Sequence, residues 1–157
     1  MKSSLDIKKI AKLHSLNKNI NQYLRKNSRL NETQIIKVSY DLQAGSYIQM
    51  YKYNKSLKNL KRLIDEINYT KFSSLLDFGS GELTNFHTML KNIKDKKSKK
   101  FFSCDLSFLR IYHGVEFLKR KNILFKNINF FVNDGIYIPL PDSSIDLVTT
   151  CHAIEPN

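Results

Sequence analysis

Apolar residues in the first part of the chain recur with the spacing of amphipathic helices. Between residues 4 and 27 they lie near helical spacing among lysines and asparagines, which predicts one helix that Ser3 or Ser4 caps. Asn31, followed three residues later by Gln34, has the pattern of a capping box and predicts the start of a second helix. The N-terminal segment is therefore expected to be helical.

Gly45 is expected to interrupt the second helix, and a third helix is predicted from about residue 46 to residue 68. The third helix has an apolar stripe whose members are three or four residues apart, as on one helical face. The stripe consists of Leu57, Leu60, Ile64 and Ile67. This face is expected to pack against a core.

After residue 68 the pattern changes to short apolar runs that alternate with helical stretches. Strands are predicted at residues 74–78, 101–105, 128–132 and 145–151. Helices are predicted at residues 82–93 and after Ser107, the latter with an inward face of Phe108, Ile111, Val115 and Leu118. This alternation predicts a Rossmann-like parallel α/β sheet with right-handed crossovers and helices over both faces.

The organisation expected from these patterns is a basic helical extension over residues 1–70 and an α/β domain over residues 71–157. The net charge is +12, of which +10 falls on residues 1–74 and +2 on residues 75–157. A basic segment attracts nucleic acid, anionic lipid or an acidic partner. The favoured interpretation is a set of solvated side chains in a Lys- and Asn-rich sequence, because no basic-aromatic motif accompanies the charge.

The remaining composition bears on location. No apolar run is long enough to cross a bilayer, and the N-terminus lacks the continuous apolar stretch of a secretory signal. Cys104 and Cys151 are too few for a disulfide scaffold, so the cytoplasm is the expected compartment. No cluster has the spacing of zinc ligands, and no metal is expected.

Each predicted strand ends in polar or glycine residues, and parallel strands bring these ends to one edge of the sheet. Gly79 and Gly81 allow a ligand to approach the backbone closely. Asp77 would repel a pyrophosphate and attract a ligand that carries an amino group and a sulfonium. Alternatively, Asp77 caps the N–H groups of the turn.

Two further acids have competing interpretations. Asp105 either accepts both hydroxyls of a ribose or caps the helix that starts near Ser107, and the ribose interpretation is favoured. Asp134 either accepts from an adenine amino group, with the Gly135 backbone nearby, or belongs to an ordinary Asn-Asp-Gly turn.

Four segments together resemble class I S-adenosylmethionine-dependent methyltransferases, in particular their type 11 branch. Residues 76–81 (LDFGSG) are similar to the first motif and residues 102–107 (FSCDLS) to the second-strand segment. Residues 133–135 (NDG), followed by residues 138–148 (IPLPDSSIDLV), are similar to the adenine-contact and fourth-strand region. The resemblance covers about residues 72–157, in the family's order.

The resemblance implies an S-adenosylmethionine site and an incomplete methyltransferase fold with an N-terminal helical extension. The implied cofactor-binding residues are Asp77, Gly79, Ser80, Gly81, Asp105, Leu106, Asp134 and Gly135, together with Tyr40 and Tyr47 from the tyrosine-rich segment 40–47. Alternatively, Tyr40 and Tyr47 are core tyrosines. Leu83 departs from the pattern, since many relatives have a third glycine there. With Glu82 it is expected to reshape the pocket near the methionine tail.

The implied activity is methyl transfer to an unidentified acceptor. His152 and Glu155 follow the fourth strand, where relatives place residues on the acceptor side. His152 is the better candidate base because its ordinary pKa is near neutral; the alternatives are a histidine bonded to backbone and a glutamate at a helix start.

A methyltransferase sheet has about seven strands, so the resemblance implies a fragment, a truncated reading frame or a chain that another polypeptide completes. The fourth strand would then have an unpaired edge and uncovered Leu147 and Val148. One alternative function is an NAD-dependent Rossmann oxidoreductase fragment, against which Asp77 and Thr84 count, Thr84 standing in place of that fingerprint's third glycine. The other is a non-catalytic remnant that binds nucleic acid or a partner through residues 1–74.

Overall fold

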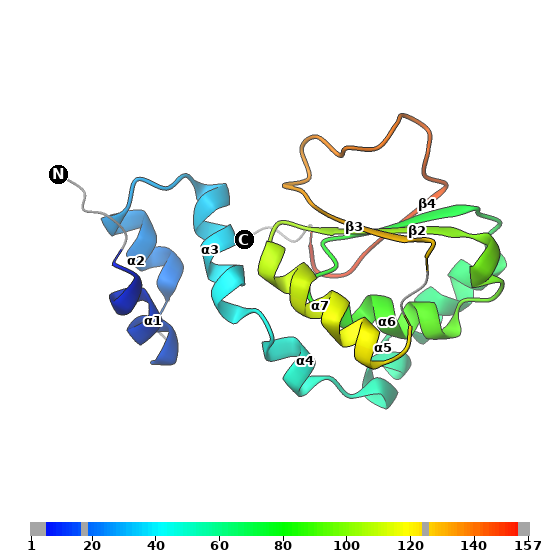
Figure 1. Cartoon of the computed structure of the whole chain (residues 1–157), viewed down its shortest axis with the longest axis horizontal. Coiled ribbons are helices and arrows are strands. Elements are labelled where there is room, and N and C mark those ends of the chain that lie inside the picture. Colours follow the sequence, from blue (N-terminus) through cyan, green and yellow to red (C-terminus); the bar gives the residue numbers. More distant parts are fainter. Residues whose placement is uncertain (1–5, 17–18, 124–125, 154–157) are drawn as a thin grey trace. The chain divides into compact units, whose positions relative to one another are not determined.

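The computed structural model describes residues 6–16, 19–123 and 126–153. The chain forms two compact units, residues 1–44, which are helical, and residues 45–157, which contain the sheet (Figure 1). This division differs from the boundary predicted at residue 70. The reason is that the helix before the sheet contributes Leu60, Ile64 and Ile67 to the core of the second unit.

The first unit consists of α1 (Ile7–Ser15), α2 (Ile20–Asn27) and α3 (Glu32–Gln43). The prediction of one helix over residues 4–27 is wrong, because the Asn19 side chain accepts the Gln22 N–H (3.0 Å) and starts a new helix. Asp6 caps α1, while Ser3 and Ser4 lie outside the described residues. The capping box of α3 is confirmed. The buried core of this unit is Ile10, Ile20, Leu24 and Ile35.

The second unit begins with α4 (Ser46–Met50) and α5 (Tyr53–Tyr69). Gly45 precedes α4 with φ +97° and interrupts the helical run as expected. The continuous helix predicted over residues 46–68 is wrong, since the chain breaks at Tyr51. The Tyr51 hydroxyl forms hydrogen bonds with His87 Nδ1 (2.8 Å) and Thr88 Oγ1 (2.9 Å). These bonds attach the break between α4 and α5 to the later helix that contains His87 and Thr88.

The sheet contains four parallel strands in the order β3-β2-β1-β4. They are β1 (Ser74–Phe78), β2 (Lys100–Asp105), β3 (Ile128–Val132) and β4 (Leu147–Thr150). The predictions for β1 and β3 are confirmed, β2 begins one residue early, and β4 is shorter than predicted. Phe78 pairs with Cys104 on one side and Thr150 on the other, so the carboxyl ends lie side by side.

Three helices lie on one face of the sheet: α5, α6 (Thr84–Asn92) and α7 (Phe108–Arg120) (Figure 1). A short 3₁₀ helix, η1 (Lys96–Ser98), precedes β2. The buried face of α7 is Ile111, Gly114, Phe117 and Leu118, whereas Phe108, predicted to point inward, is 55% exposed at the first helical position. No helix in the described part of the chain is long and apolar enough to cross a membrane.

The other face of the sheet carries the long loop from β3 to β4 (Figure 1). The expectation that helices cover both faces is therefore wrong for the described residues. Val148 on β4 is 58% exposed, as expected for an uncovered strand, while Leu147 is half-buried against the core. Because β1 lies between β2 and β4, the chain order reverses there, and parallel sheets bind ligands at the carboxyl ends beside such a point.

Candidate functional site

The turn that follows β1 is built from two glycines with left-handed backbone conformations. Gly79 has φ +67° and Gly81 has φ +55°, a region that residues with a Cβ rarely adopt. The Ser80 N–H between them donates to the Cys104 carbonyl (2.9 Å) and holds the turn against β2. A Cβ on Gly79 would lie 2.1 Å from the Cβ of Ala153, so the segment after β4 packs directly on this glycine.

Asp77 lies near the carboxyl end of β1 and is only 2% exposed. Its Oδ1 accepts a hydrogen bond from Thr149 Oγ1 on β4 (2.9 Å). Burial raises the pKa of Asp77 to about 7, while the bond from Thr149 lowers it and the charge of Asp105 raises it further. A ligand cation beside Asp77 would stabilise the ionised carboxylate, and a phosphate would oppose it.

Asp105 joins the end of β2 to both the glycine turn and α7. Its Oδ2 accepts the Gly81 N–H (2.8 Å) and its Oδ1 accepts the Ser107 N–H (2.9 Å). Ser107 itself caps α7 by accepting the Arg110 N–H at 3.1 Å, as the sequence predicts. Asp105, and not Asp77, thus accepts the Gly81 N–H of the turn, and each of its carboxylate oxygens keeps a further lone pair for a ligand hydroxyl.

The turn after β3 approaches the end of β1. Asn133 Oδ1 accepts the Gly135 N–H (2.6 Å) and Asp134 Oδ1 accepts the Ile136 N–H (3.1 Å), which is the turn geometry that the Asn-Asp-Gly alternative describes. Gly135 has φ +84°, and a Cβ there would lie 2.7 Å from Cζ of Phe78. The turn therefore packs on the last residue of β1, and the side chain of Asp134 is exposed.

A cluster that the motifs did not indicate surrounds Gly81. The Arg110 guanidinium lies 5.0 Å from the ring centroid of Tyr47, and its Nη2 would lie 2.9 Å from a Cβ on Gly81. Its Nε is 4.0 Å from Oε1 of Glu82. Glu82 Oε2 accepts the Ile48 N–H (2.9 Å), which attaches α4 to the glycine turn.

The position of Arg110 could be read from helix geometry alone. It lies in the first turn of α7, three residues after the cap Ser107, and helical side chains point back toward the N-terminus of their helix. The N-terminus of α7 follows β2 at the carboxyl edge of the sheet. No family motif includes this arginine. Its contact with Tyr47 depends on the approach of α4 to the glycine turn.

Glu82 and Leu83 precede α6 instead of beginning the helix as predicted. Leu83 has φ +58° and is fully buried. A Cβ on Gly114 of α7 would lie 2.5 Å from Cγ of Leu83, so this leucine fills the contact between the turn and α7. The departure from the three-glycine pattern therefore serves helix packing at this point.

The other candidates are distributed differently. Leu106 is half-buried between Asp105 and Ser107. Tyr40 lies on α3, in the first unit, and stays a prediction as a site residue. His152 is exposed just beyond β4 with φ +61°. Glu155 lies outside the described residues, so the catalytic roles of both His152 and Glu155 stay predictions.

The two cysteines are free thiols. Cys104 is fully buried in β2, and burial raises its pKa to about 11. Cys151 is half-buried after β4, and burial raises its pKa as well. Neither thiol has the lowered pKa of a nucleophile. Within residues 6–16, 19–123 and 126–153, no group of three or more His, Cys, Asp or Glu side chains is arranged to hold a metal ion.

Comparisons with known proteins agree with this architecture. No protein-family model and no curated protein matches the chain in sequence. Among solved structures, the [4+2]-cyclase SpnF matches with a TM-score of 0.57 at 14% identity, over 75% of this chain and 48% of that chain. Phosphoethanolamine N-methyltransferase 1 of Haemonchus contortus, in complex with phosphoethanolamine and S-adenosylhomocysteine, matches with a TM-score of 0.55 at 14% identity, over 75% and 24%.

A third solved structure is the complex between the Haloferax volcanii Trm112 methyltransferase activator and its partner protein. It matches with a TM-score of 0.51 at 17% identity, over 71% of this chain and 46% of that chain. The chain thus spans less than half the length of each of these three structures. The fold of residues 45–157 is the Rossmann-like α/β fold of class I S-adenosylmethionine-dependent methyltransferases. One of the three is described as a cyclase, so the structural similarity establishes the fold alone. The reaction has to be inferred from the residues of the site.

Proposed function

We propose that the chain is the cofactor-binding portion of an S-adenosylmethionine-dependent methyltransferase. The observation that carries the proposal is the buried Asp77 carboxylate, whose pKa is raised to about 7 and which lies two residues before the glycine turn at the carboxyl end of β1. A nucleoside with an ammonium and a sulfonium group suits such a carboxylate. The NAD-dependent alternative would place a pyrophosphate there, beside two acids.

The residues at the strand ends divide the recognition of this cofactor. Asp77 would hold the cationic methionine end and Asp105 the two ribose hydroxyls, while Asp134 accepts from the adenine amino group. The backbones of Gly79, Ser80, Gly81 and Gly135 would line the cradle, with Leu106 beside the ribose and Tyr47 at the glycine turn. The remaining lone pairs of Asp105 fit the ribose hydroxyls of this group.

The bound cofactor supplies a methyl group on a positively charged sulfur, which needs little further activation. The contribution of the chain is to hold that sulfur in line with the acceptor and to exclude water. His152 is proposed as the base for an acceptor that must lose a proton, with Glu155 as the second candidate. The acceptor itself is unidentified.

We further propose that another segment, from this polypeptide or a partner, completes the sheet along β4. Val148 is 58% exposed, and among the described strands β4 has a neighbour only on the side of β1. Exposed edges of this kind are templates for strand pairing. A cytoplasmic location is proposed on the two free thiols.

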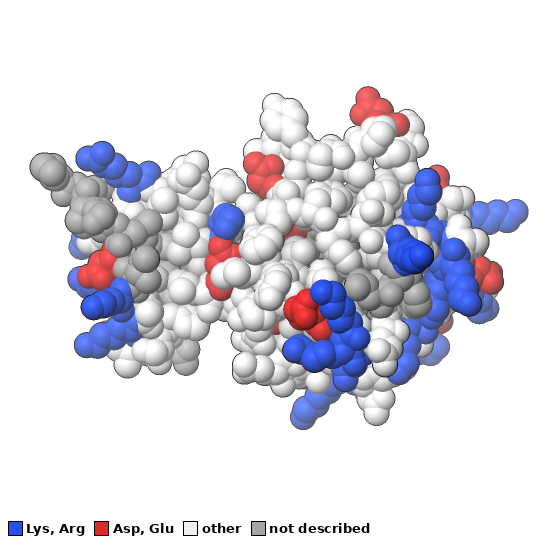
Figure 2. Space-filling model, in the orientation of Figure 1, with Lys and Arg blue, Asp and Glu red and all other residues white. Residues whose placement is uncertain are grey.

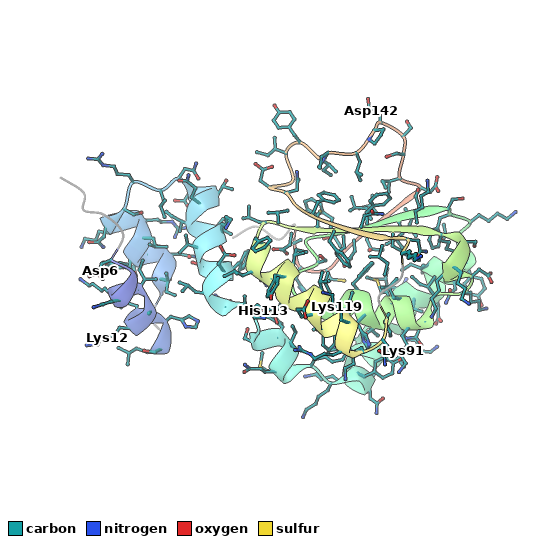
Figure 3. All side chains as sticks on the ribbon, in the orientation of Figure 1. Asp6, Lys12, Lys91, His113, Lys119 and Asp142 are labelled. Carbon is teal, nitrogen blue, oxygen red and sulfur yellow. The ribbon has the colours of Figure 1, made fainter. Side chains whose placement is uncertain are left out.

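Calorimetric titration with S-adenosylhomocysteine and with NAD⁺ tests the cofactor proposal. We expect the first ligand to bind and the second to give no heat. Asp77→Asn should weaken binding by about tenfold or more, since an ion pair is lost. The matched control is Asp142→Asn at the exposed tip of the β3–β4 loop (Figure 3), which should change affinity by less than about twofold. Preferential binding of NAD⁺ would overturn the proposal.

A further inference from the structure

The strongest concentration of charge in the second unit lies at the edge of the sheet opposite the candidate site. Three segments lead into the amino ends of β1, β2 and β3, and we call their described residues the basic edge: Lys71, residues 91–100, and residues 119–123 with Lys126. Residues 91–100 contain six lysines and one aspartate, and the third segment contains four Lys or Arg and no acid. Figure 2 shows Lys and Arg side chains gathered over this end of the unit, on the right of the view.

Backbone and amide hydrogen bonds tie the three segments into one continuous surface. The Asn127 amide donates to the Lys96 carbonyl (2.9 Å) and to the Lys99 carbonyl, which joins the segment before β3 to the segment before β2. The Lys100 N–H donates to the Ser73 carbonyl (2.7 Å), which joins the latter to the start of β1. The backbone segments that carry the lysines are therefore joined to one another at this edge.

The helix ends that approach this edge add to it. The Lys91 ammonium of α6 lies 4.3 Å from the ring centroid of Tyr53, and the Lys121 ammonium after α7 lies 5.8 Å from that of Phe117. Burial lowers the pKa of His87 to about 4, and the charges of these two lysines lower it further. Lys91 and Lys119 are labelled in Figure 3, toward the ends of α6 and α7. Lys119 is paired with Glu116 (2.7 Å).

Several ammonium groups stay available to a ligand. The side chains of Lys97, Lys100 and Lys126 are exposed. Lys99 donates to the carbonyl of Phe72, which is neutral and leaves the positive charge of the ammonium group in place. A surface with this excess of positive charge attracts a polyanion and releases counterions when it binds one.

An aromatic side chain stands beside these lysines. Tyr69, the last residue of α5, is 88% exposed. Its neighbour Asn68 accepts the Lys94 N–H (2.9 Å) and donates to the Asn92 carbonyl (3.2 Å), so Tyr69 lies next to the segment before β2. A ring exposed among lysines is a stacking platform for an unpaired base.

We propose that the basic edge binds single-stranded nucleic acid, with phosphates paired to its lysines and a base stacked on Tyr69. The exposed ring of Tyr69 beside the lysines favours this ligand over an anionic membrane, because a base stacks on an aromatic ring. The surface is separated from Asp77 and Asp105 by the length of the strands, about 17 Å for five residues, so it does not depend on the cofactor proposal.

Fluorescence anisotropy with labelled oligouridylate and oligothymidylate of about twenty nucleotides tests the proposal on the full chain. We expect both to bind, with affinity falling steeply as salt rises. The variant Lys97→Glu/Lys100→Glu/Lys126→Glu should weaken binding at least about tenfold. Its slope of log K against log salt should fall by about two, since about 0.7 is lost for each phosphate contact to a single strand.

The matched control is Lys52→Glu/Lys55→Glu/Lys58→Glu, at the N-cap and in the first turns of α5, which makes the same change in net charge at other exposed positions. Its affinity should stay within about threefold of the parent, and an equal loss in both variants would overturn a localised surface. Tyr69→Ala should weaken binding at least about fivefold while Tyr69→Phe preserves it. Circular dichroism establishes that each variant is folded.

Vesicles of phosphatidylserine and phosphatidylcholine test the alternative ligand, an anionic membrane. Sedimentation with vesicles, without oligonucleotide binding, would overturn the proposal in favour of a membrane surface. If S-adenosylhomocysteine fails to bind, the conclusion from oligonucleotide binding is unaffected. The reason is that the oligonucleotides and the basic-edge variants do not involve the carboxyl edge of the sheet.

Discussion

Asp105 accepts the backbone N–H of Gly81 at 2.8 Å, which joins the end of β2 to the glycine turn after β1. The same carboxylate accepts the Ser107 N–H at 2.9 Å, so one buried side chain sets the position of the turn and of α7 together. The candidate ribose-binding acid is thus also the group that holds the cradle in shape.

Asp105→Asn should lower both stability and cofactor affinity. An amide offers one acceptor oxygen, and its NH₂ group would face one of the two N–H donors. We expect the free energy of unfolding to fall by about 1–3 kcal/mol in urea denaturation, and affinity for S-adenosylhomocysteine to fall in calorimetry. Asp142→Asn is the control, and equal stabilities of the two variants would contradict the role of these bonds.

Gly79→Ala should be more damaging than Gly45→Ala. Both glycines have positive φ, so both substitutions strain the backbone by about 1 kcal/mol. Only at Gly79 would the new Cβ lie 2.1 Å from the Cβ of Ala153, whereas nothing lies within 4 Å at Gly45. Urea denaturation should show the larger loss for Gly79→Ala, together with weaker S-adenosylhomocysteine binding. Equal losses would mean that the segment after β4 does not pack on the turn.

The raised pKa of Asp77 predicts how stability depends on pH. The unfolded chain ionises this carboxyl near pH 4, whereas the native pKa is about 7, so the native state binds more protons between these values. The stability that the protonated carboxyl contributes is present below about pH 4 and is lost as pH rises through about 7. Asp77→Asn should flatten this decline in denaturation measured from pH 5 to pH 8.

The same carboxyl predicts how cofactor affinity depends on pH. A cationic ligand favours ionised Asp77, so affinity for S-adenosylmethionine should rise about tenfold between pH 6 and pH 8. Calorimetry in buffers of different ionisation enthalpy should detect a released proton. Thr149→Val removes the hydrogen bond that lowers this pKa, and should shift the rise to higher pH. An affinity that is flat in pH for the parent protein would contradict an ionising Asp77 in the site.

Arg110→Ala should destabilise the turn, because it removes the cation nearest to a buried acid. The Glu82 side chain is fully buried, and its Oε1 has no hydrogen-bond partner among the described residues besides the approach of Arg110 Nε at 4.0 Å. We expect a loss of about 1–3 kcal/mol in urea denaturation. Adding Glu82→Gln should recover part of it, since the charge is removed while the amide oxygen still accepts from Ile48. Additive effects of the two substitutions would contradict the coupling.

The elements that depend on local chemistry could be predicted from the amino-acid sequence. Strands β1 and β3, the capping box at Asn31 and the cap at Ser107 follow from apolar runs and from side chains that bond their own backbone a few residues away. The parallel arrangement also follows, since alternating strands and helices leave few topologies. These features need no knowledge of which distant segments meet.

The positions of the helix breaks and of the charged clusters depend on contacts between distant segments. The break at Tyr51 arises because its hydroxyl bonds residues of α6, and Leu83 precedes α6 because it packs against Gly114 of α7. The approach of α4 brings Tyr47 to Arg110, and the strand starts bring lysines from three segments to one edge beside Tyr69. Contacts between residues far apart in the chain have no periodic signal, because their energies depend on which surfaces become buried together.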